Sequence, residues 1–564
     1  MNTPQAFILM MFVFFFPEVF CQNLKLKIDG STPSETLIID SLNYSKYHKD
    51  YISLESEIDS TQKQLYKLGF IENELSGINK ISDSLFHANF NLKTRFNNLL
   101  IYYDESVIQK TTLELVSNKV YDDYFEIKLS ETENVLGFLN ESTSAKGFPF
   151  SKLKLSEIEI DDTGILTAQL KIETSQEKRI INDIKIKGYN KFPEAFLKHY
   201  LKIKRSQTFD LADIKNKTQQ LQNLRFTSEV KPPEVLFSKD STTLYLYLKK
   251  EQNNSFDGFL GFGTNEETSR IQFDGYINLK LTNNLNFGES FKILYKSDEN
   301  DQETFLVDLS MPYMFKSPIG LDLSMNLFRK DSTFTTINQS AKLNYQINAR
   351  HKISSGILFE ESNNLLSTNA LISIQDYRKN FVSFSYEYTN VKKANLLFPI
   401  HSNVYLETNF GNRKESSNTS KQTVLRADLF KIFNLNHKNS LYIRGNGAII
   451  DSDLHFENEL LRFGGINSIR GFEENSLFAS LYGLINTEYR FQLNNSIYLH
   501  SVIDAAYFEN KTQNLNQKLF SYGFGFGILT KSGLFKLNYA NGKRENEQFK
   551  LSNSKVHISL TTIF

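Results

Sequence analysis

Leu461-Arg462-Phe463-Gly464-Gly465-Ile466-Asn467-Ser468-Ile469-Arg470-Gly471-Phe472 is a glycine-rich stretch that lies between two strand-like runs. The run before it covers Leu441 to Ile450, and the run after it covers Ala479 to Leu493. An arginine beside a glycine in a loop is ordinarily a solvated turn. The strands that follow this loop indicate a different role for its arginine.

These strands carry acidic residues on one face. From Ala479 to Leu493 the odd positions are largely apolar and the even positions, including Glu488, are largely polar. Successive side chains of a strand point to opposite faces, so Glu488 belongs to the polar face. The next run, Ile497 to Phe508, places Asp504 on its less apolar face. Two carboxylates are therefore expected to face inward near a loop that carries one arginine.

This pattern resembles the BamA/TamA superfamily of outer-membrane β-barrel assembly and translocation proteins. Its hallmark is a Gly-Gly and Arg-Gly-Phe/Tyr loop after the eleventh barrel strand, followed by strands with an inward Glu and an inward Asp. The matching positions of this sequence are Gly464, Gly465, Arg470, Gly471, Phe472, Glu488 and Asp504. The resemblance implies that Arg470 pairs with Asp504 inside the barrel, with Glu488 nearby. Ser310-Met311-Pro312-Tyr313 also resembles the family's Pro-aromatic motif at the end of the fourth strand.

Length and composition limit the possible classes of protein. At 564 residues the chain is long enough for several domains. Lys+Arg and Asp+Glu are equal at 64 each, which gives no indication of nucleic-acid binding. Cys21 is the single cysteine, so no internal disulfide is possible. The nine histidines are scattered, so we expect no zinc-type cluster and no metal or other cofactor.

The N-terminus has the features of an export signal. Phe7 to Phe16 is an apolar run too short to span a bilayer, and it is typical of a signal-peptide core within residues 1–21. No Lys or Arg precedes this run, which departs from the usual pattern. Cleavage before Gln22 is the favoured interpretation, and a lipidated Cys21 is the alternative. No other stretch reaches about 18 apolar residues, so a membrane would be crossed by a closed barrel.

Residues 22–251 contain a weak repeat, with expected domains at 22–97, 98–175 and 176–251. The third copy is the clearest, with a strand in Ile180 to Gly188, helical spacing from Pro193, and two strands near Val230 to Phe237 and Thr242 to Leu248. The order of strand, helix, helix, strand, strand resembles the POTRA domain that the family carries on its periplasmic side.

The sheet edges of such domains are the expected docking sites for extended clients, because an edge strand offers unpaired N–H and C=O groups. Pro232 and Pro233 stand in the expected edge strand of the third copy. Proline removes a ladder donor, so these residues are expected to interrupt that strand and make this copy the poorest docking edge.

Residues 252–564 change to short alternating strands. Phe305, Val307 and Leu309 lie on one face, with Asp308 and Ser310 on the other. We expect an all-β, 16-stranded antiparallel transmembrane barrel that follows three α+β repeats. Eleven strands precede the Arg470 loop and five follow it, residues 452–478 fold into the lumen, and residues 360–377 form an outer loop.

The ends of the barrel form a predicted lateral seam. The first strand, Ser255 to Thr264, contains Gly258, Gly261 and Gly263, which should weaken and bend it. The last strand ends at Phe564 and resembles the C-terminal aromatic signal of outer-membrane barrels. The resemblance implies that the seam opens and that a client strand pairs with the first strand.

The resemblance implies a non-enzymatic assembly, insertion or translocation factor in the outer membrane of a Gram-negative bacterium, with its repeats in the periplasm. Three repeats resemble the TamA-like branch. The implied partners are unfolded outer-membrane protein clients, outer-membrane lipids, and either accessory lipoproteins or an inner-membrane partner. The sequence contains no nucleophile elbow, metal cluster or phosphate loop, so no catalytic residues are predicted. A secretion pore dedicated to one partner protein and a passive outer-membrane channel are the alternatives.

Overall fold

The computed structural model describes residues 23–173, 177–264, 271–297, 302–366, 373–392, 395–416, 418–530, 533–551 and 554–563. The chain divides into two compact units. The first ends at Arg179 and includes Thr208–Asp210, and the second comprises Ile180–Gln207 and Leu211–Phe564. The predicted signal peptide, with Cys21, and the terminal Phe564 lie outside the described residues.

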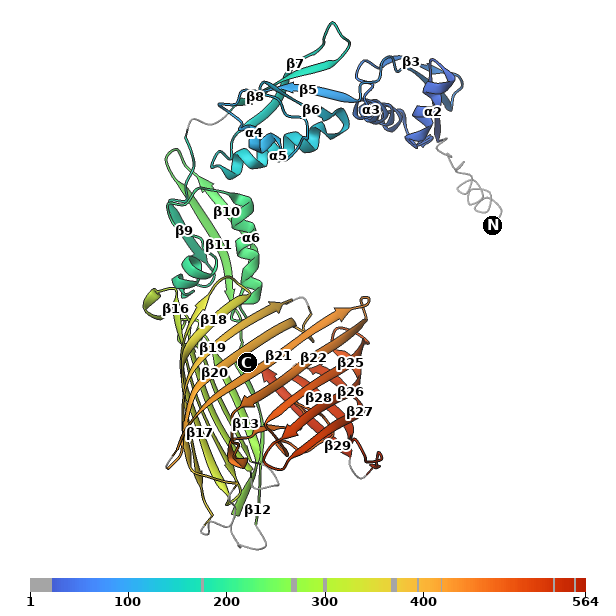
Figure 1. Ribbon diagram of the computed structural model, residues 1–564. Helices are drawn as coiled ribbons and strands as arrows, with labels where there is room; N and C mark the ends of the chain where they lie inside the picture. The colour runs from blue at the N-terminus through green and yellow to red at the C-terminus, as the bar shows by residue number, and fades with distance from the viewer. Residues whose placement is uncertain are drawn as a thin grey trace, which may run out of the picture. The chain divides into compact units, whose positions relative to one another are not determined.

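The first unit contains two α+β repeats (Figure 1). The first repeat has the sheet order β2-β1-β4-β3, and the second has the order β6-β5-β8-β7. The elements of the first repeat are β1 Leu24–Gly30, α2 Pro33–Ser41, β2 Tyr47–His48, α3 Tyr51–Lys67, β3 Glu74–Lys80 and β4 Leu85–Asn91. Those of the second are β5 Asn98–Tyr102, α4 Lys110–Leu113, β6 Tyr124–Lys128, η1 Leu129–Glu131, α5 Thr132–Ala145, β7 Lys152–Ile160 and β8 Leu166–Glu173.

Local sequence explains where the long helices of these repeats begin and end. The Asp50 side chain accepts a hydrogen bond from the backbone N–H of Ser53, and the Ser53 hydroxyl accepts one from the backbone N–H of Asp50, so α3 begins with a capping box. Gly69 and Gly147 follow α3 and α5 with φ of 102° and 99°. This left-handed backbone favours glycine, as the sequence predicts. Leu54, one of the buried residues of α3, packs in the core of the first repeat.

The third repeat belongs to the second unit and has the sheet order β10-β11-β9. Its elements are β9 Asp183–Lys187, the π-helix η2 Phe196–Tyr200, α6 Leu211–Gln219, η3 Gln220–Asn223, β10 Thr227–Phe237 and β11 Thr242–Lys250. The strand predicted over Ile180 to Gly188 is therefore shorter at both ends.

Pro232 and Pro233 interrupt the pairing of the edge strand of this repeat, as predicted, but they do not end the strand. β10 continues through both residues, and its pairing with β11 shifts between Lys231 and Glu234. An edge strand has a partner on one side only, so it can accommodate residues without an N–H by a local bulge. The edge strands β3 and β7 also contain a register shift, so bulges occur in all three repeats.

The second unit also contains a closed barrel (Figure 1). Eleven strands precede the Arg470 loop: β12 Ser255–Thr264, β13 Ile271–Thr282, β14 Ser290–Ser297, β15 Gln302–Met311, β16 Ile319–Lys330, β17 Phe334–Gln346, β18 His351–Asn364, β19 Tyr377–Val391, β20 Ile400–Lys414, β21 Thr419–Asn434 and β22 Asn439–Asp451. Five follow it: β25 Leu481–Gln492, β26 Ile497–Asn510, β27 Leu515–Thr530, β28 Gly533–Arg544 and β29 Ser554–Ile563. The prediction of sixteen antiparallel strands is confirmed.

The predicted outer loop at residues 360–377 is wrong at both ends. β18 continues to Asn364, and β19 begins at Tyr377. The carboxylate of Glu360 lies 2.8 Å from the Lys379 ammonium, which stabilises these strand ends inside the barrel. Both ends of the predicted loop therefore belong to strands.

Side chains of the barrel strands alternate between two environments. In β26, Leu499, Ile503 and Tyr507 are exposed on the outer face. His500 and Asp504 alternate with them and are buried on the inner face. This arrangement puts apolar groups outside and polar groups inside, as a barrel in lipid requires. Among the described residues, no helix is both long and apolar enough to cross a membrane.

Aromatic residues join the third repeat to the turns at one end of the barrel. The Phe196 ring packs edge-on against Tyr313, which follows β15, with ring centroids 4.9 Å apart. The Tyr189 hydroxyl accepts a hydrogen bond from Asn283 Nδ2 at 2.7 Å. Gly288, in the turn between β13 and β14, has a φ of 79°, and a Cβ there would overlap the Phe196 ring. The Pro-aromatic motif thus contacts the third repeat through its tyrosine.

We predict that Gly288→Ala loosens this joint. The methyl group would collide with Phe196, and the left-handed backbone would add strain of about 1–2 kcal/mol. Hydrogen exchange of the backbone amides of η2 should become faster, while the circular dichroism of the barrel should be unchanged.

Gly164→Ala is the matched control for this substitution. Gly164 has a φ of 81°, but no described heavy atom lies within 4 Å of a Cβ at this position. Gly164→Ala therefore introduces the backbone strain without a steric collision. The backbone amides of η2 should exchange with solvent at the wild-type rate. Unchanged exchange in Gly288→Ala would show that Phe196 does not hold the joint.

Candidate functional site

Residues 452–480, which we call the lumen loop, connect β22 to β25 and contact the inner face of the barrel. Within the loop, η5 Glu457–Glu459 is followed by β23 Leu461–Phe463, which pairs with β24 Leu477–Ala479. Gly464 and Gly465 follow β23 with φ of 109° and 95°. A Cβ at Gly464 would lie 2.6 Å from the carbonyl oxygen of Glu473. The Gly-Gly pair therefore allows the loop to turn tightly on itself.

Arg470 lies against both predicted carboxylates. Its Nε donates to Asp504 Oδ2 at 2.9 Å, and its Nη2 donates to Asp504 Oδ1 at 2.5 Å. Its Nη1 donates to Glu488 Oε1 at 2.5 Å. The backbone N–H of Arg470 also donates to Asp504 Oδ2 at 3.0 Å. The guanidinium thus binds one carboxylate through two hydrogen bonds and a second carboxylate through one.

This cluster is enclosed by the loop and the barrel wall. Arg470, Asp504 and Glu488 are 5%, 2% and 9% exposed. A buried charge is tolerated only where partners replace its hydration, and each of these groups has such a partner. Arg490, which the sequence analysis did not select, completes the cluster because its Nη2 lies 2.7 Å from Glu488 Oε2.

The residues after Arg470 extend the loop towards the last strands of the barrel. A Cβ at Gly471 would lie 2.5 Å from the backbone nitrogen of Gly542 in β28. Phe472 packs at the edge of a cluster that includes Ile469 and Leu519. Glycine at 471 and an aromatic ring at 472 therefore bring the loop backbone close to β28.

The tip of the loop also reaches strands on both sides of the predicted seam. Glu473 pairs with Lys555 of β29 at 2.9 Å. Glu474 pairs with Lys296 of β14 at 3.5 Å. These four side chains are partly exposed, so each pair contributes little to stability, about 0–1 kcal/mol.

The base of the lumen loop has a second buried anchor that the sequence analysis missed. Glu459 accepts from Arg413 Nη1 of β20 at 2.5 Å and lies 3.2 Å from Lys379 Nζ of β19. Gln422 of β21 donates to its other oxygen at 3.1 Å. The side chains of Glu459 and Arg413 are fully buried. The loop is thus held to β19–β21 as well as to β25 and β26.

One feature of the sequence indicates that a second anchor is needed. Lys379 and Arg413 lie on inward-facing positions of their strands, where a cation without water needs a counter-charge. The sequence could not identify Glu459 as that counter-charge, because 46 positions separate it from Arg413.

The seam residues lie where the two ends of the barrel meet. Among the described residues, β12 and β29 form two register pairs, Ser255–Ile563 and Phe256–Thr562. β12 forms ten pairs with β13, and β29 forms eight with β28. Gly258, Gly261 and Gly263 lie in β12 beyond its pairing with β29.

Within the described ranges, no three histidine, cysteine or carboxylate side chains converge as metal ligands would. The buried acids described above are instead occupied by guanidinium, ammonium and amide groups.

Two family models match the chain. The POTRA model, described as surface antigen variable number repeat, matches residues 179–250. The Omp85 superfamily domain matches residues 280–560. No curated protein matches the chain in sequence.

Solved structures share the fold at low sequence identity. CdiB from Escherichia coli has a TM-score of 0.55 and 14% identity, covering 90% of this chain and 97% of that chain. CdiB from Acinetobacter baumannii has a TM-score of 0.51 and 16% identity, covering 82% and 89%. BamA from Haemophilus ducreyi lacking POTRA domains 1–3 has a TM-score of 0.50 and 13% identity, covering 82% and 99%. These likenesses show the fold alone.

We predict a strong energetic coupling between Arg470 and Asp504. Arg470→Ala and Asp504→Asn should each lower the free energy of unfolding by about 3–5 kcal/mol, because each leaves a buried group without its partner. The double substitution should cost less than the sum. Arg470→Lys should restore only part of the loss, since an ammonium cannot bind both carboxylate oxygens as a planar fork does. Urea unfolding of the wild type, Arg470→Ala, Asp504→Asn and the double variant measures the cycle, and Arg470→Lys is measured beside them.

Arg378 and Glu361 provide the control cycle. This pair, at 3.0 Å, is largely exposed. Its coupling energy should be about 0–1 kcal/mol. If the Arg470–Asp504 coupling were as small as this, Arg470 would behave as a solvated turn residue.

Proposed function

The chain belongs to the Omp85 superfamily of outer-membrane β-barrel proteins with periplasmic POTRA domains, and we propose that it inserts other proteins into the outer membrane. The observation that carries this proposal is the short ladder between β12 and β29. A passive channel has no need of a wall that can open sideways, whereas an insertion factor does.

The chemistry of the seam suits a client strand. Beyond Phe256, no residue pair joins β12 to β29 in the described part of the chain. The N–H and C=O groups on that side of β12 are therefore available for an extended segment, which would add to the sheet by main-chain hydrogen bonds. Gly258, Gly261 and Gly263 lower the cost of bending this strand outward.

The POTRA domains would hold clients before they reach the barrel. The edge strands β3, β7 and β10 each have one free side within their sheets. An unfolded outer-membrane protein could pair with such an edge through its backbone, independently of its side chains. Further proposed partners are outer-membrane lipids and either accessory lipoproteins or an inner-membrane partner. The proposed role is non-enzymatic and needs no cofactor.

A secretion pore dedicated to one partner protein is the second candidate. The polar inner face of the barrel favours it, because a hydrated lumen can pass an unfolded chain. In that role the lumen loop would have to leave its two anchors. In the insertion role it can stay in place, which is why we prefer insertion.

Depletion of the protein in its native cell separates the two roles. Under the insertion proposal, quantitative proteomics of the outer membrane should show a broad fall in β-barrel proteins. Loss of a single secreted protein, with the outer-membrane set unchanged, would support the secretion pore instead.

We predict that closing the seam covalently abolishes activity. Cysteines at Ser255 and Ile563, which are register partners, should form a disulfide on oxidation. The oxidised protein should fail to insert a small client barrel into liposomes, and reduction should restore insertion. The physical reason is that β12 can no longer separate from β29.

Cysteines at Leu537 and Ile558 provide the matched control. These residues are register partners in β28 and β29, so their disulfide does not cross the seam. This variant should remain active after oxidation. Full activity with the seam locked would exclude lateral opening and favour a channel.

A further inference from the structure

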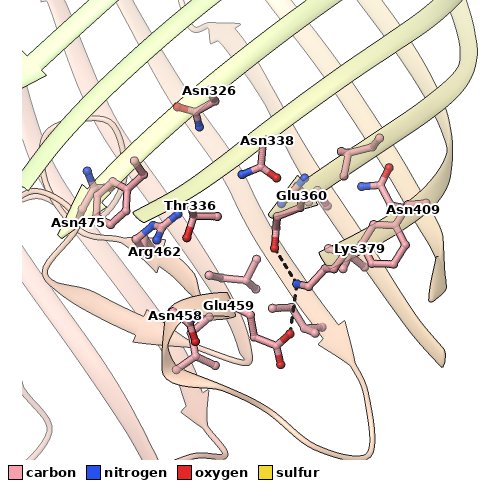
Figure 2. Close-up of a pocket in the computed structure, with 18 of the residues that line it drawn as sticks. Asn326, Thr336, Asn338, Glu360, Lys379, Asn409, Asn458, Glu459, Arg462 and Asn475 are labelled. Carbon is pink, nitrogen blue, oxygen red and sulfur yellow. Dashed lines mark ion pairs between the residues drawn. The ribbon is translucent and has the colours of Figure 1, made fainter. Parts of the chain in front are cut away.

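A polar cavity of about 280 Å³ lies inside the barrel between the lumen loop and the strands β15–β22 (Figure 2). This volume is near the lower end, roughly 300 Å³, of small-molecule sites. It is far above the roughly 10–15 Å³ that a single water needs. The loop contributes Glu459, Arg462 and Asn475 to its wall, and the barrel contributes Asn326, Asn338 and Asn409.

Most charges around the cavity are already neutralised. Figure 2 shows Lys379 between Glu360 and Glu459, at 2.8 and 3.2 Å. Glu459 also pairs with Arg413, and the lining residue Arg426 pairs with Glu407. The two carboxylates of the cavity therefore have cationic partners and would repel an entering anion only weakly.

Arg462 differs from these residues. Its guanidinium stacks on the Phe328 ring, with 3.7 Å between Cζ and the ring centroid. Within the described residues, no carboxylate lies at ion-pair distance from it, and its buried Nη1 has no hydrogen-bond partner. A buried donor left without a partner costs about 1–3 kcal/mol, and more for a charged group. The ring fixes the guanidinium plane, and Nη1 is left without a partner in the described residues.

Two asparagines that line the cavity have buried amide oxygens without donors among the described residues. Asn409 is 1% exposed, and its Nδ2 donates to Glu407 Oε1 at 2.8 Å. This bond orients the amide, so the unpartnered atom is the oxygen Oδ1. Asn326 Oδ1 is likewise buried without a partner in the described part of the chain.

We propose that this cavity binds a small, water-soluble, hydroxylated oxyanion. The oxyanion group would accept hydrogen bonds from Arg462, and the hydroxyls would donate to the amide oxygens of Asn326 and Asn409. A guanidinium binds phosphate and carboxylate through parallel hydrogen bonds, so either group fits the Arg462 end. The ligand would contact the lumen loop and the barrel wall at once, and would satisfy the polar atoms that the protein leaves unpaired.

The test is calorimetric titration of the full-length protein in detergent with glycerol 3-phosphate, which combines one phosphate with two hydroxyls. Glycerol is the neutral probe, inorganic phosphate is the probe without a carbon chain, and glycolate is the carboxylate probe. We expect glycerol 3-phosphate to bind, glycerol not to bind, and Arg462→Gln to weaken glycerol 3-phosphate binding at least tenfold. Binding of glycolate but not of inorganic phosphate would identify a carboxylate ligand within the same proposal.

Arg378→Gln is the control, because it removes the same charge from an exposed position that does not line the cavity. It should bind glycerol 3-phosphate as the wild type does. If Arg462→Gln fails to fold by circular dichroism, Asn338→Asp provides a second variant, since it adds a negative charge to the cavity wall and should also weaken binding at least tenfold. The proposal is overturned if the wild type binds none of the anions, or if the cavity variants bind glycerol 3-phosphate as tightly as the wild type does. The cavity would then hold only water.

Discussion

Backbone N–H and C=O groups inside a membrane have no water to bond with, so a chain that crosses it with strands must pair every one of them in a closed barrel. In this barrel each neighbouring pair of strands forms at least eight register pairs in the described residues, with one exception. The exception is β12 with β29, which form two. Backbone pairing is therefore least complete between β12 and β29, the first and last strands of the barrel, and the wall is weakest there.

The lumen loop is held by buried charged groups, and burying a charged group costs desolvation free energy. Removing a carboxylate or guanidinium from water costs several kcal/mol. Ion-pair and hydrogen-bond partners in the protein offset this cost only where their geometry is good. Arg470 with Asp504 and Arg413 with Glu459 have that geometry. Apolar contacts would hold the loop without this desolvation cost. They are non-directional, so they would allow the loop to shift along the barrel wall more easily. Directional bonds at two places fix which loop residues face which strands, and this fixes where Gly471 meets β28.

Local patterns predicted the features that depend on neighbouring residues. Alternation gave the inward faces of Glu488 and Asp504, and glycines marked the helix ends at Gly69 and Gly147. The pairing of Arg470 with Asp504, 34 positions away, came from the resemblance to a family motif. Other features that depend on distant residues were missed. Glu459 meets Arg413 only after β20 and the loop are placed in one lumen, and Phe196 meets Tyr313 across 117 positions. The proline pair in β10 was correctly predicted to interrupt the pairing, but that the strand continues beyond it depends on the strand having one neighbour rather than two.

The contacts of the lumen loop are unequal, and this inequality determines what can move. Its anchors at Arg470 and Glu459 are buried, and breaking such a pair costs about 3–5 kcal/mol. Its contacts beside the seam, Glu473 with Lys555 and Glu474 with Lys296, are partly exposed and contribute about 0–1 kcal/mol each. Separation of β29 from β12 would break two backbone register pairs and a weak ion pair. Withdrawal of the loop would break both buried anchors. Parting of the seam with the loop in place is therefore the less costly of the two movements, and it opens the wall towards lipid rather than the lumen towards water.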